Sequence, residues 1–362
     1  MTPINKHTLK NSLLTAGFLI LALLAFTTIV KPSSTYASTI QVNSKADTAA
    51  DDGECTLREA IDSANGNVVS GGTTNECVAG DASPTTDTIE FNISGTADFT
   101  RQGQDGYKIA LQSALSSLAE TVIIDGYSQP NALYNTDPNQ TRILIEIDGA
   151  ATTAASAFYI DSPNSTVRGL SVYDFEYSCI GTSDLADNAT IEGNYVGISG
   201  DNQTVLGSAN EGITLGQSGG SENSTIVSNL ISGVTYNGIT INGVSNSSIE
   251  NNIISDGDSG GISFGINSPS DEVDVVGNIV SNNADGGIFV TTGGVPAVIN
   301  VYSNTVLNNG TGGIGVFAAS GVRIGAPGLG NTVYGHSQGN IGVTSLTGFF
   351  GAVSNVTIQS NT

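Results

Sequence analysis

The chain has 362 residues, of which 33 are acidic and only 10 are Lys or Arg, so its formal net charge at pH 7 is −23. Such a surface disfavours nucleic acid and anionic lipid as partners, because binding to either relies on Lys and Arg contacts. Glycine and asparagine are abundant, but Ile and Val recur at regular intervals among them. That periodicity indicates an ordered chain rather than a disordered one.

Residues 1–37 have the pattern of a secretory signal. Lys6 and Lys10 precede an apolar segment from Leu13 to Val30, and a short polar stretch then ends in small residues at Ala37. The alternative is an uncleaved anchor, since the apolar segment is nearly long enough to span a membrane. Cleavage would remove three lysines and leave 7 bases against 33 acids, a formal charge of 7 − 33 = −26, on an exported chain without a further membrane span.

A strand is expected at Ser38–Asn43, and one amphipathic helix follows it. Thr56 and Glu59 form the capping-box pattern that starts helices. The residues Leu57, Ala60, Ile61 and Ala64 then fall on one helical face. A single helix beside a first strand suits the end of a solenoid, where apolar side chains and strand edges need a cover.

Three cysteines remain to be placed. Cys55 and Cys77 flank the predicted helix and its loop, and disulfides persist in exported chains, so we predict a bridge between them. The alternative is two free buried thiols. Cys179 is expected to be a small core residue, and the spacing of the three cysteines is not that of a zinc site.

Short β-branched runs begin at Asp87 and predict the first coils of the solenoid. The expected strands are residues 88–93, 107–111, 122–124, 143–147, 158–160 and 167–172. The segments 112–120 and 127–140 interrupt this pattern, and irregular loops are where such a scaffold carries function.

Two phrases repeat between Asn188 and Val316. An Ile/Val-x-x-Asn phrase ends at asparagines separated by 35, 23, 26 and 26 residues, namely Asn194, Asn229, Asn252, Asn278 and Asn304. A Gly-Ile phrase recurs half a period away, at Gly212, Gly238, Gly261, Gly287 and Gly313. Strand-like alternation between turn residues, without a helical stripe or regular Leu, excludes helical and leucine-rich repeats. We therefore predict an all-β, right-handed parallel β-helix with roughly 23–26 residues per coil.

The asparagines of the first phrase would stack at one corner of the coils. Strands in a sheet are about 4.8 Å apart, which lets side-chain amides hydrogen-bond up the column. We predict an inward structural ladder of these five asparagines; the alternative is that they only form turns.

The motif Cys-Thr-Leu-Arg-Glu-Ala-Ile at Cys55–Ile61 resembles the signature of the CSLREA-domain proteins, with Thr56 where that family has Ser. Residues 121–130 and a shortened Gly-rich phrase at 324–331 are also similar to phrases of these chains. The resemblance covers roughly residues 39–362. It implies a secreted, often surface-associated bacterial protein with right-handed parallel β-helix repeats, and it implies no defined activity.

The expected organisation is a signal at 1–37, a CSLREA-like cap at 38–86 and β-helix repeats at 87–362. After Val316 the period continues through residues 340–343 and 358–361, and Thr362 falls inside a phrase that elsewhere leads to another strand. We therefore expect further chain or a partner to cover that end of the solenoid.

Acidic turn residues are the candidate binding sites. One group comprises Asp256, Asp258 and Asp285, with Asp201 as a further member. A second comprises Asp271, Glu272 and Asp274. Solvated turn residues are the simplest interpretation of both groups, and weak calcium binding through carboxylates and turn carbonyls is the other. No other cofactor is expected.

Catalysis has little support in the sequence. No Lys, Arg or His lies between Arg168 and Arg323, so the regular coils lack the basic partner that cleavage of uronate polymers needs. We predict a non-catalytic, exported module that serves in adhesion at the cell surface or as a scaffold of the cell envelope. Its expected partner is a surface carbohydrate or protein. The alternative is a carbohydrate-active β-helix enzyme, either a polysaccharide lyase or a glycoside hydrolase.

Overall fold

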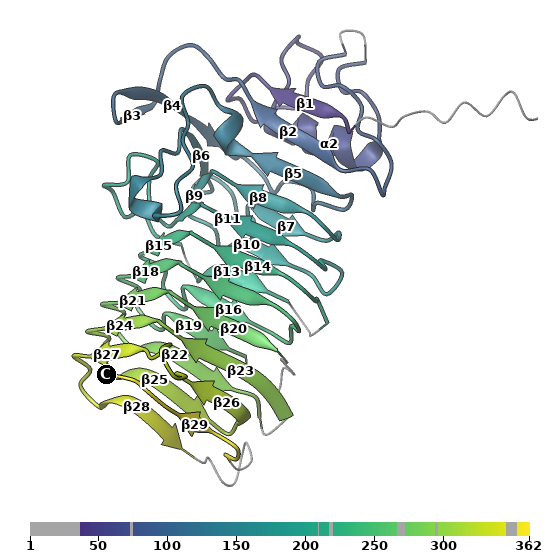
Figure 1. Cartoon of the computed structure of the whole chain (residues 1–362). Coiled ribbons are helices and arrows are strands. Elements are labelled where there is room, and N and C mark those ends of the chain that lie inside the picture. Colours follow the sequence, from purple (N-terminus) through teal and green to yellow (C-terminus); the bar gives the residue numbers. More distant parts are fainter. Residues whose placement is uncertain are drawn as a thin grey trace, which may run out of the picture. The chain divides into compact units, whose positions relative to one another are not determined.

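The computed structural model describes residues 37–72, 75–208, 210–216, 220–265, 272–293, 296–344 and 353–362. Residues 37–362 form one compact unit, in which successive coils stack from the β1 end to the β28 end (Figure 1). Residues 1–36 of the signal predicted at 1–37 lie outside the described residues. Among the helices that the structure describes, none is long and apolar enough to cross a membrane.

Three sheets run along the stack, and their neighbouring strands pair in parallel, apart from the antiparallel hairpin β3–β4. The 11-stranded sheet contains β1 (Thr39–Val42), β2 (Asp87–Phe91), β5 (Val122–Asp125), β8 (Thr166–Arg168), β11 (Thr190–Glu192), β14 (Thr225–Val227), β17 (Ser248–Glu250), β20 (Val273–Val276), β23 (Pro296–Tyr302), β26 (Ser320–Ile324) and β29 (Thr357–Ile358).

The other two sheets complete each coil. The 10-stranded sheet contains β3 (Phe99–Arg101), β4 (Gln104–Ala110), β6 (Ile145–Asp148), β9 (Ser171–Tyr173), β12 (Tyr195–Val196), β15 (Leu230–Ser232), β18 (Ile253–Ser255), β21 (Ile279–Ser281), β24 (Thr305–Leu307) and β27 (Thr332–Tyr334). The 8-stranded sheet contains β7 (Phe158–Ile160), β10 (Ser178–Thr182), β13 (Glu211–Leu215), β16 (Ile239–Ile241), β19 (Ile262–Phe264), β22 (Gly286–Thr291), β25 (Gly312–Phe317) and β28 (Gly339–Thr344).

This arrangement confirms the predicted all-β parallel β-helix. Inward positions of each sheet carry aliphatic side chains that stack on their equivalents one coil away. In the 11-stranded sheet, Ile226 pairs in register with Ile249, which pairs with Val275, and all three are buried. Each coil therefore buries its apolar face against its neighbours, as a solenoid requires.

One strand prediction was wrong. Residues 167–172 were expected to form a single strand, but β8 ends at Arg168 and β9 begins at Ser171. Gly169 between them has a φ of +72°, a conformation that turns the chain at a corner of the coil and that glycine adopts without strain. Every regular coil has this corner, and it separates the 11-stranded from the 10-stranded sheet.

The asparagine ladder is present at this corner, and it is longer than predicted. The Asn252 amide donates through Nδ2 to Asn278 Oδ1 and to the Ile226 carbonyl, at 3.0 Å each. Its Oδ1 accepts from the backbone N–H of Asn229 at 2.9 Å and from Asn229 Nδ2 at 3.0 Å. The same pattern joins the column Asn194, Asn229, Asn252, Asn278, Asn304, Asn331 and Asn361.

A second ladder, which the sequence analysis did not predict, lies at the next corner. Asn283 donates through its backbone N–H and its Nδ2 to Asn309 Oδ1, at 3.0 and 2.9 Å. The backbone N–H of Asn309 then donates to His336 Nδ1 at 3.1 Å, and His336 Nε2 faces the Val306 carbonyl at 3.2 Å. The histidine thus replaces an asparagine as the last member of this column.

The helix α2 (Leu57–Gly66) covers the first coil and contacts β1 and β2. The predicted capping box is present, since the Thr56 hydroxyl accepts from the Glu59 backbone N–H and Glu59 accepts from the Thr56 backbone N–H. Cys55 and Cys77 form the expected disulfide, which ties the start of the helix to the loop behind it. Cys179 is free and buried, and burial raises the pKa of its thiol to about 12, so the thiol stays protonated and unreactive.

Candidate functional site

The first predicted acidic group lies on exposed turns. Asp256, Asp258 and Asp285 are all exposed. Asp285 accepts a hydrogen bond from the Thr311 hydroxyl at 3.1 Å, and Asp201 lies in an earlier coil beside Ser199. Asp201 therefore does not join Asp256, Asp258 and Asp285, the group in which the sequence had suggested it as a further member.

The second acidic group is only partly described. Asp271 lies outside the described residues, whereas Glu272 and Asp274 are exposed. Asp274 accepts from Asn300 Nδ2 at 2.7 Å. Over the part of the chain that the structure describes, no group of three or more His, Cys, Asp or Glu side chains could hold a metal ion. Calcium binding at these turns thus stays a prediction.

The basic residues of the described chain have structural partners. Ion pairs join Lys45 to Asp98, Arg58 to Asp47, Lys108 to Asp148 and Arg168 to Asp125, at 2.8, 2.8, 3.2 and 2.8 Å respectively. Arg101, Arg142 and Arg323 donate to carbonyl or side-chain amide oxygens of neighbouring segments.

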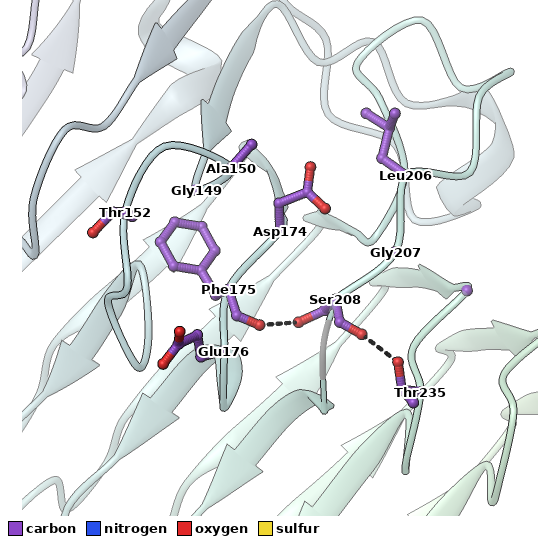
Figure 2. A pocket seen from close by; sticks show the side chains of 11 residues that line it. Gly149, Ala150, Thr152, Asp174, Phe175, Glu176, Leu206, Gly207, Ser208 and Thr235 are labelled. Carbon is purple, nitrogen blue, oxygen red and sulfur yellow. Dashed lines mark hydrogen bonds between the residues drawn. The ribbon is translucent and has the colours of Figure 1, made fainter.

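One hollow of about 530 Å³ lies where the chain turns after β6, β9 and β12 (Figure 2). Asp174 and Glu176 both line it, and the buried Phe175 separates them. Two hydrogen bonds hold its wall: Ser208 Oγ donates to the Phe175 carbonyl at 3.0 Å, and Thr235 Oγ1 donates to the Ser208 carbonyl at 2.9 Å (Figure 2). Two carboxyl groups therefore share a concave and otherwise uncharged surface.

Asp174 has a perturbed environment. Burial raises the pKa of its carboxyl, and the neighbouring Asp148 charge raises the pKa further, while Lys108 opposes both. Sequence reasoning missed this residue because Asp148 and Asp174, although 26 residues apart, precede Asn188, where the two repeating phrases begin.

A second hollow of about 500 Å³ lies on the outer face of the 8-stranded sheet. Its aromatic lining comprises Tyr177, Tyr236, Phe264, Phe289 and Phe317, and its polar lining comprises Glu211, Asn237, Thr240, Asn242, Ser263 and Thr291. A smaller hollow of about 230 Å³ adjoins it and shares Phe289 and Phe317. We call the two together the aromatic groove.

Buried carboxyl groups give the protein a predictable response to pH. Burial is the leading cause that raises the pKa of four of them above the ordinary value: Asp87, Glu146, Asp174 and Glu211. Because the folded state then binds protons more readily than the unfolded chain, stability falls as the pH rises through these raised values. We expect a higher melting temperature at about pH 5 than at pH 8.

Two other carboxyl groups, those of Asp98 and Asp201, have lowered pKa values, so they make stability rise with pH, but at lower pH. Burial alone would raise the pKa of Asp98, yet hydrogen bonds from Lys45 and the Lys108 backbone outweigh it; at Asp201, hydrogen bonds from Ser199 and nearby backbone N–H groups do the same. Their lowered pKa values stabilise the fold above pH 4 and cease to do so below it. Thermal unfolding followed from pH 8 to pH 5 tests the balance, and Glu146→Gln should flatten the curve. A melting temperature that falls over this range would contradict the assignment.

A match to one family model supports the fold. Residues 157–335 match the model of the right-handed beta helix region. No curated protein matches the chain. Among solved structures, the Dettilon tailspike protein is similar at 16% identity and a TM-score of 0.49 over 76% of this chain, which spans 55% of the tailspike.

Two enzymes among the solved structures are similar to this chain at comparably low sequence identity. The periplasmic alginate epimerase AlgG has 16% identity and a TM-score of 0.44, with 76% of this chain and 69% of that one covered. The pectate lyase Pel9A has 12% identity and a TM-score of 0.43, with coverages of 90% and 80%. These likenesses are too distant to bear on function. The three parallel sheets and the matched family model together identify residues 157–335 as a right-handed parallel β-helix region.

Proposed function

We propose that this chain is an exported, non-catalytic β-helix module that serves in adhesion at the cell surface or as a scaffold of the cell envelope. The signal-like residues 1–37 and the disulfide between Cys55 and Cys77 support export, because such bridges persist outside the reducing cytoplasm. The resemblance of residues 55–61 to the CSLREA signature supports a surface-associated role. The net charge of −23 argues against nucleic acid as a partner.

The main support for a non-catalytic role is that the basic side chains are engaged in structural hydrogen bonds and ion pairs. A lyase of uronate polymers needs a group that removes the C5 proton and a cation that stabilises the developing charge on the carboxylate. In the described residues, the Lys and Arg side chains are held by acids, carbonyls or amides, and His336 ends an asparagine column. Neither hollow described above is lined by a basic residue.

A specific observation favours one alternative. Asp174 and Glu176 line one hollow, and burial with the Asp148 charge raises the pKa of Asp174. Glycoside hydrolysis uses a carboxylic acid of raised pKa together with a second carboxylate. The second candidate function is therefore hydrolysis of a glycan in this hollow, with Asp174 as the general acid and Glu176 as the carboxylate partner.

A cleavage assay separates the two functions. The purified protein is incubated with pectin, alginate, xylan and β-glucan, with and without calcium, and new reducing ends and unsaturated uronides are measured. We expect no release above that of the Asp174→Asn variant, because no basic residue lines this hollow to serve uronate cleavage, and Phe175 lies between Asp174 and Glu176 (Figure 2). Product that the wild-type chain releases and Asp174→Asn does not would overturn the proposal and establish the hydrolase.

A further inference from the structure

The aromatic groove has a floor of outward-facing glycines. In the outer column that begins with Glu211 and Asn237, the next three coils carry Gly260, Gly286 and Gly312. The Phe289 ring lies directly over Gly286, where any Cβ would collide with it. Phe317 covers Gly315 in the same way, since a Cβ there would lie 2.6 Å from Phe317 Cε2. Because glycine has no side chain, the phenyl rings of Phe289 and Phe317 can lie against the sheet at these positions.

Three aromatic rings from different coils line the groove. Tyr236 precedes β16, Phe289 lies in β22 two coils further on, and Phe317 lies in the adjacent β25. The ring centroids of Phe289 and Phe317 are 5.8 Å apart and edge-to-face. From β10 to β28 the 8-stranded sheet has six strand steps, or about 29 Å. That length suits an extended oligomer better than a single small molecule.

Between the rings the groove offers hydroxyl and amide groups. Thr240 and Ser263 line the groove at consecutive positions of the central outer column. Asn237 Nδ2 donates to Thr240 Oγ1 at 3.2 Å, and both side chains also hydrogen-bond to Glu211. The lining polar groups that a ligand can reach are therefore those of the partly exposed Asn242, Ser263 and Thr291. A pyranose ring presents an apolar C–H face and a hydroxyl edge, so it complements an aromatic surface bordered by such groups.

The charge of the groove excludes ionic ligands. Among the described residues that line it, only Glu211 is charged; its side chain is 7% exposed and accepts from the Thr214 hydroxyl at 3.0 Å, with Asn237 and Thr240 beside it. A carboxylate that is buried and already hydrogen-bonded offers little to a cation. No Lys, Arg or His lines either hollow, so an anionic glycan finds no counter-charge.

The backbone of the groove excludes strand addition by a peptide. The strands β13, β16, β19 and β22 each pair with a neighbour on both sides. Their N–H and C=O groups are used within the sheet, whereas a peptide that extends a sheet needs a free edge.

We propose that the aromatic groove on the 8-stranded sheet binds an uncharged oligosaccharide, held by Tyr236, Phe289 and Phe317 and by the amide and hydroxyl groups between them. This inference deepens the proposed adhesion role, on which it rests, by naming the ligand class.

Isothermal titration of the whole protein tests it. The probes are the neutral hexasaccharides of glucose, mannose and xylose, with a hexagalacturonate and a proline-rich decapeptide as the competing ligand classes. We expect at least one neutral hexasaccharide to bind and Tyr236→Ala to weaken that binding about tenfold or more, because aromatic anchors dominate such contacts. Tyr236 is 53% exposed, so its removal leaves the core intact.

Tyr334→Ala is the matched control. Tyr334 is 52% exposed but lies in β27 of the 10-stranded sheet, outside the groove. Its variant should bind as the wild type does. Failure of all neutral probes, preference for the uronate or the peptide, or equal loss in both variants would overturn the groove assignment. Cleavage products in the same samples would instead contradict the non-catalytic role. If Tyr236→Ala still weakened binding in that case, the assignment of the groove as the binding site would stand.

Discussion

Replacing Asn252 with Ala should lower the free energy of unfolding by roughly 3–6 kcal/mol, because it breaks four buried hydrogen bonds of one column. The substitution leaves the Asn229 backbone N–H and Nδ2, the Ile226 carbonyl and the Asn278 Oδ1 without this partner. These groups are buried, and each buried polar group that loses its partner costs about 1–3 kcal/mol. Thermal unfolding followed by circular dichroism measures the effect.

Asn246→Gly is the control for this variant. Asn246 is an exposed turn residue with a φ of 51°, a conformation that glycine adopts without strain, so the change removes a side chain and adds no backbone penalty. Its melting temperature should stay close to that of the wild type. If the two variants lost the same stability, the column would contribute no more than a turn does.

The parts of the fold that repeat at a constant period could be predicted from the sequence. Equivalent residues of successive coils meet in space, so five members of the asparagine column and the Gly-Ile column were visible as phrases. Asn331 was missed because Gly-Leu-Gly-Asn lacks the Ile or Val that starts the phrase. Residues 358–361 were recognised as a continuation of the period, but Asn361 was not assigned to the ladder. The second column offered a comparable signal, since Asn283 and Asn309 are also 26 residues apart, but two members were too few to stand out.

The candidate sites could not be predicted in the same way. Arg101 donates to the Asp201 carbonyl across 100 residues, because the early hairpin β3–β4 reaches a loop of a later coil. Contacts of this kind depend on loop geometry rather than on a repeat. The aromatic groove could not be predicted from the sequence either, because Tyr236, Phe289 and Phe317 occupy different columns of the repeat. Only the folded sheet brings them onto one face.

The Gly-Ile phrase itself has a steric cause, and this leads to the second large expected effect. Gly261→Ala should destabilise the protein by about 3 kcal/mol or more, since a Cβ at this position would overlap with Val280 Cγ1 and lie 2.6 Å from the Gly287 carbonyl oxygen. Neither neighbour can move freely, because Val280 is buried in the core and Gly287 belongs to the next strand of the sheet. The equivalent glycines 212, 238, 287 and 313 meet the same kind of obstacle, an apolar side chain of the 10-stranded sheet and a carbonyl one coil away.

Gly342→Ala separates this steric effect from a general effect of losing glycine. Gly342 lies in β28 of the same sheet, directly after Ile341, and a Cβ there would have no heavy atom within 4 Å. Its variant should keep the wild-type stability or gain a few tenths of a kcal/mol, because alanine restricts the unfolded chain more than glycine does. Chemical denaturation of both variants under one set of conditions gives the comparison. A loss in Gly342→Ala as large as that in Gly261→Ala would mean that flexibility of the strands, and not the close approach of two sheets, explains why glycine precedes isoleucine in each coil.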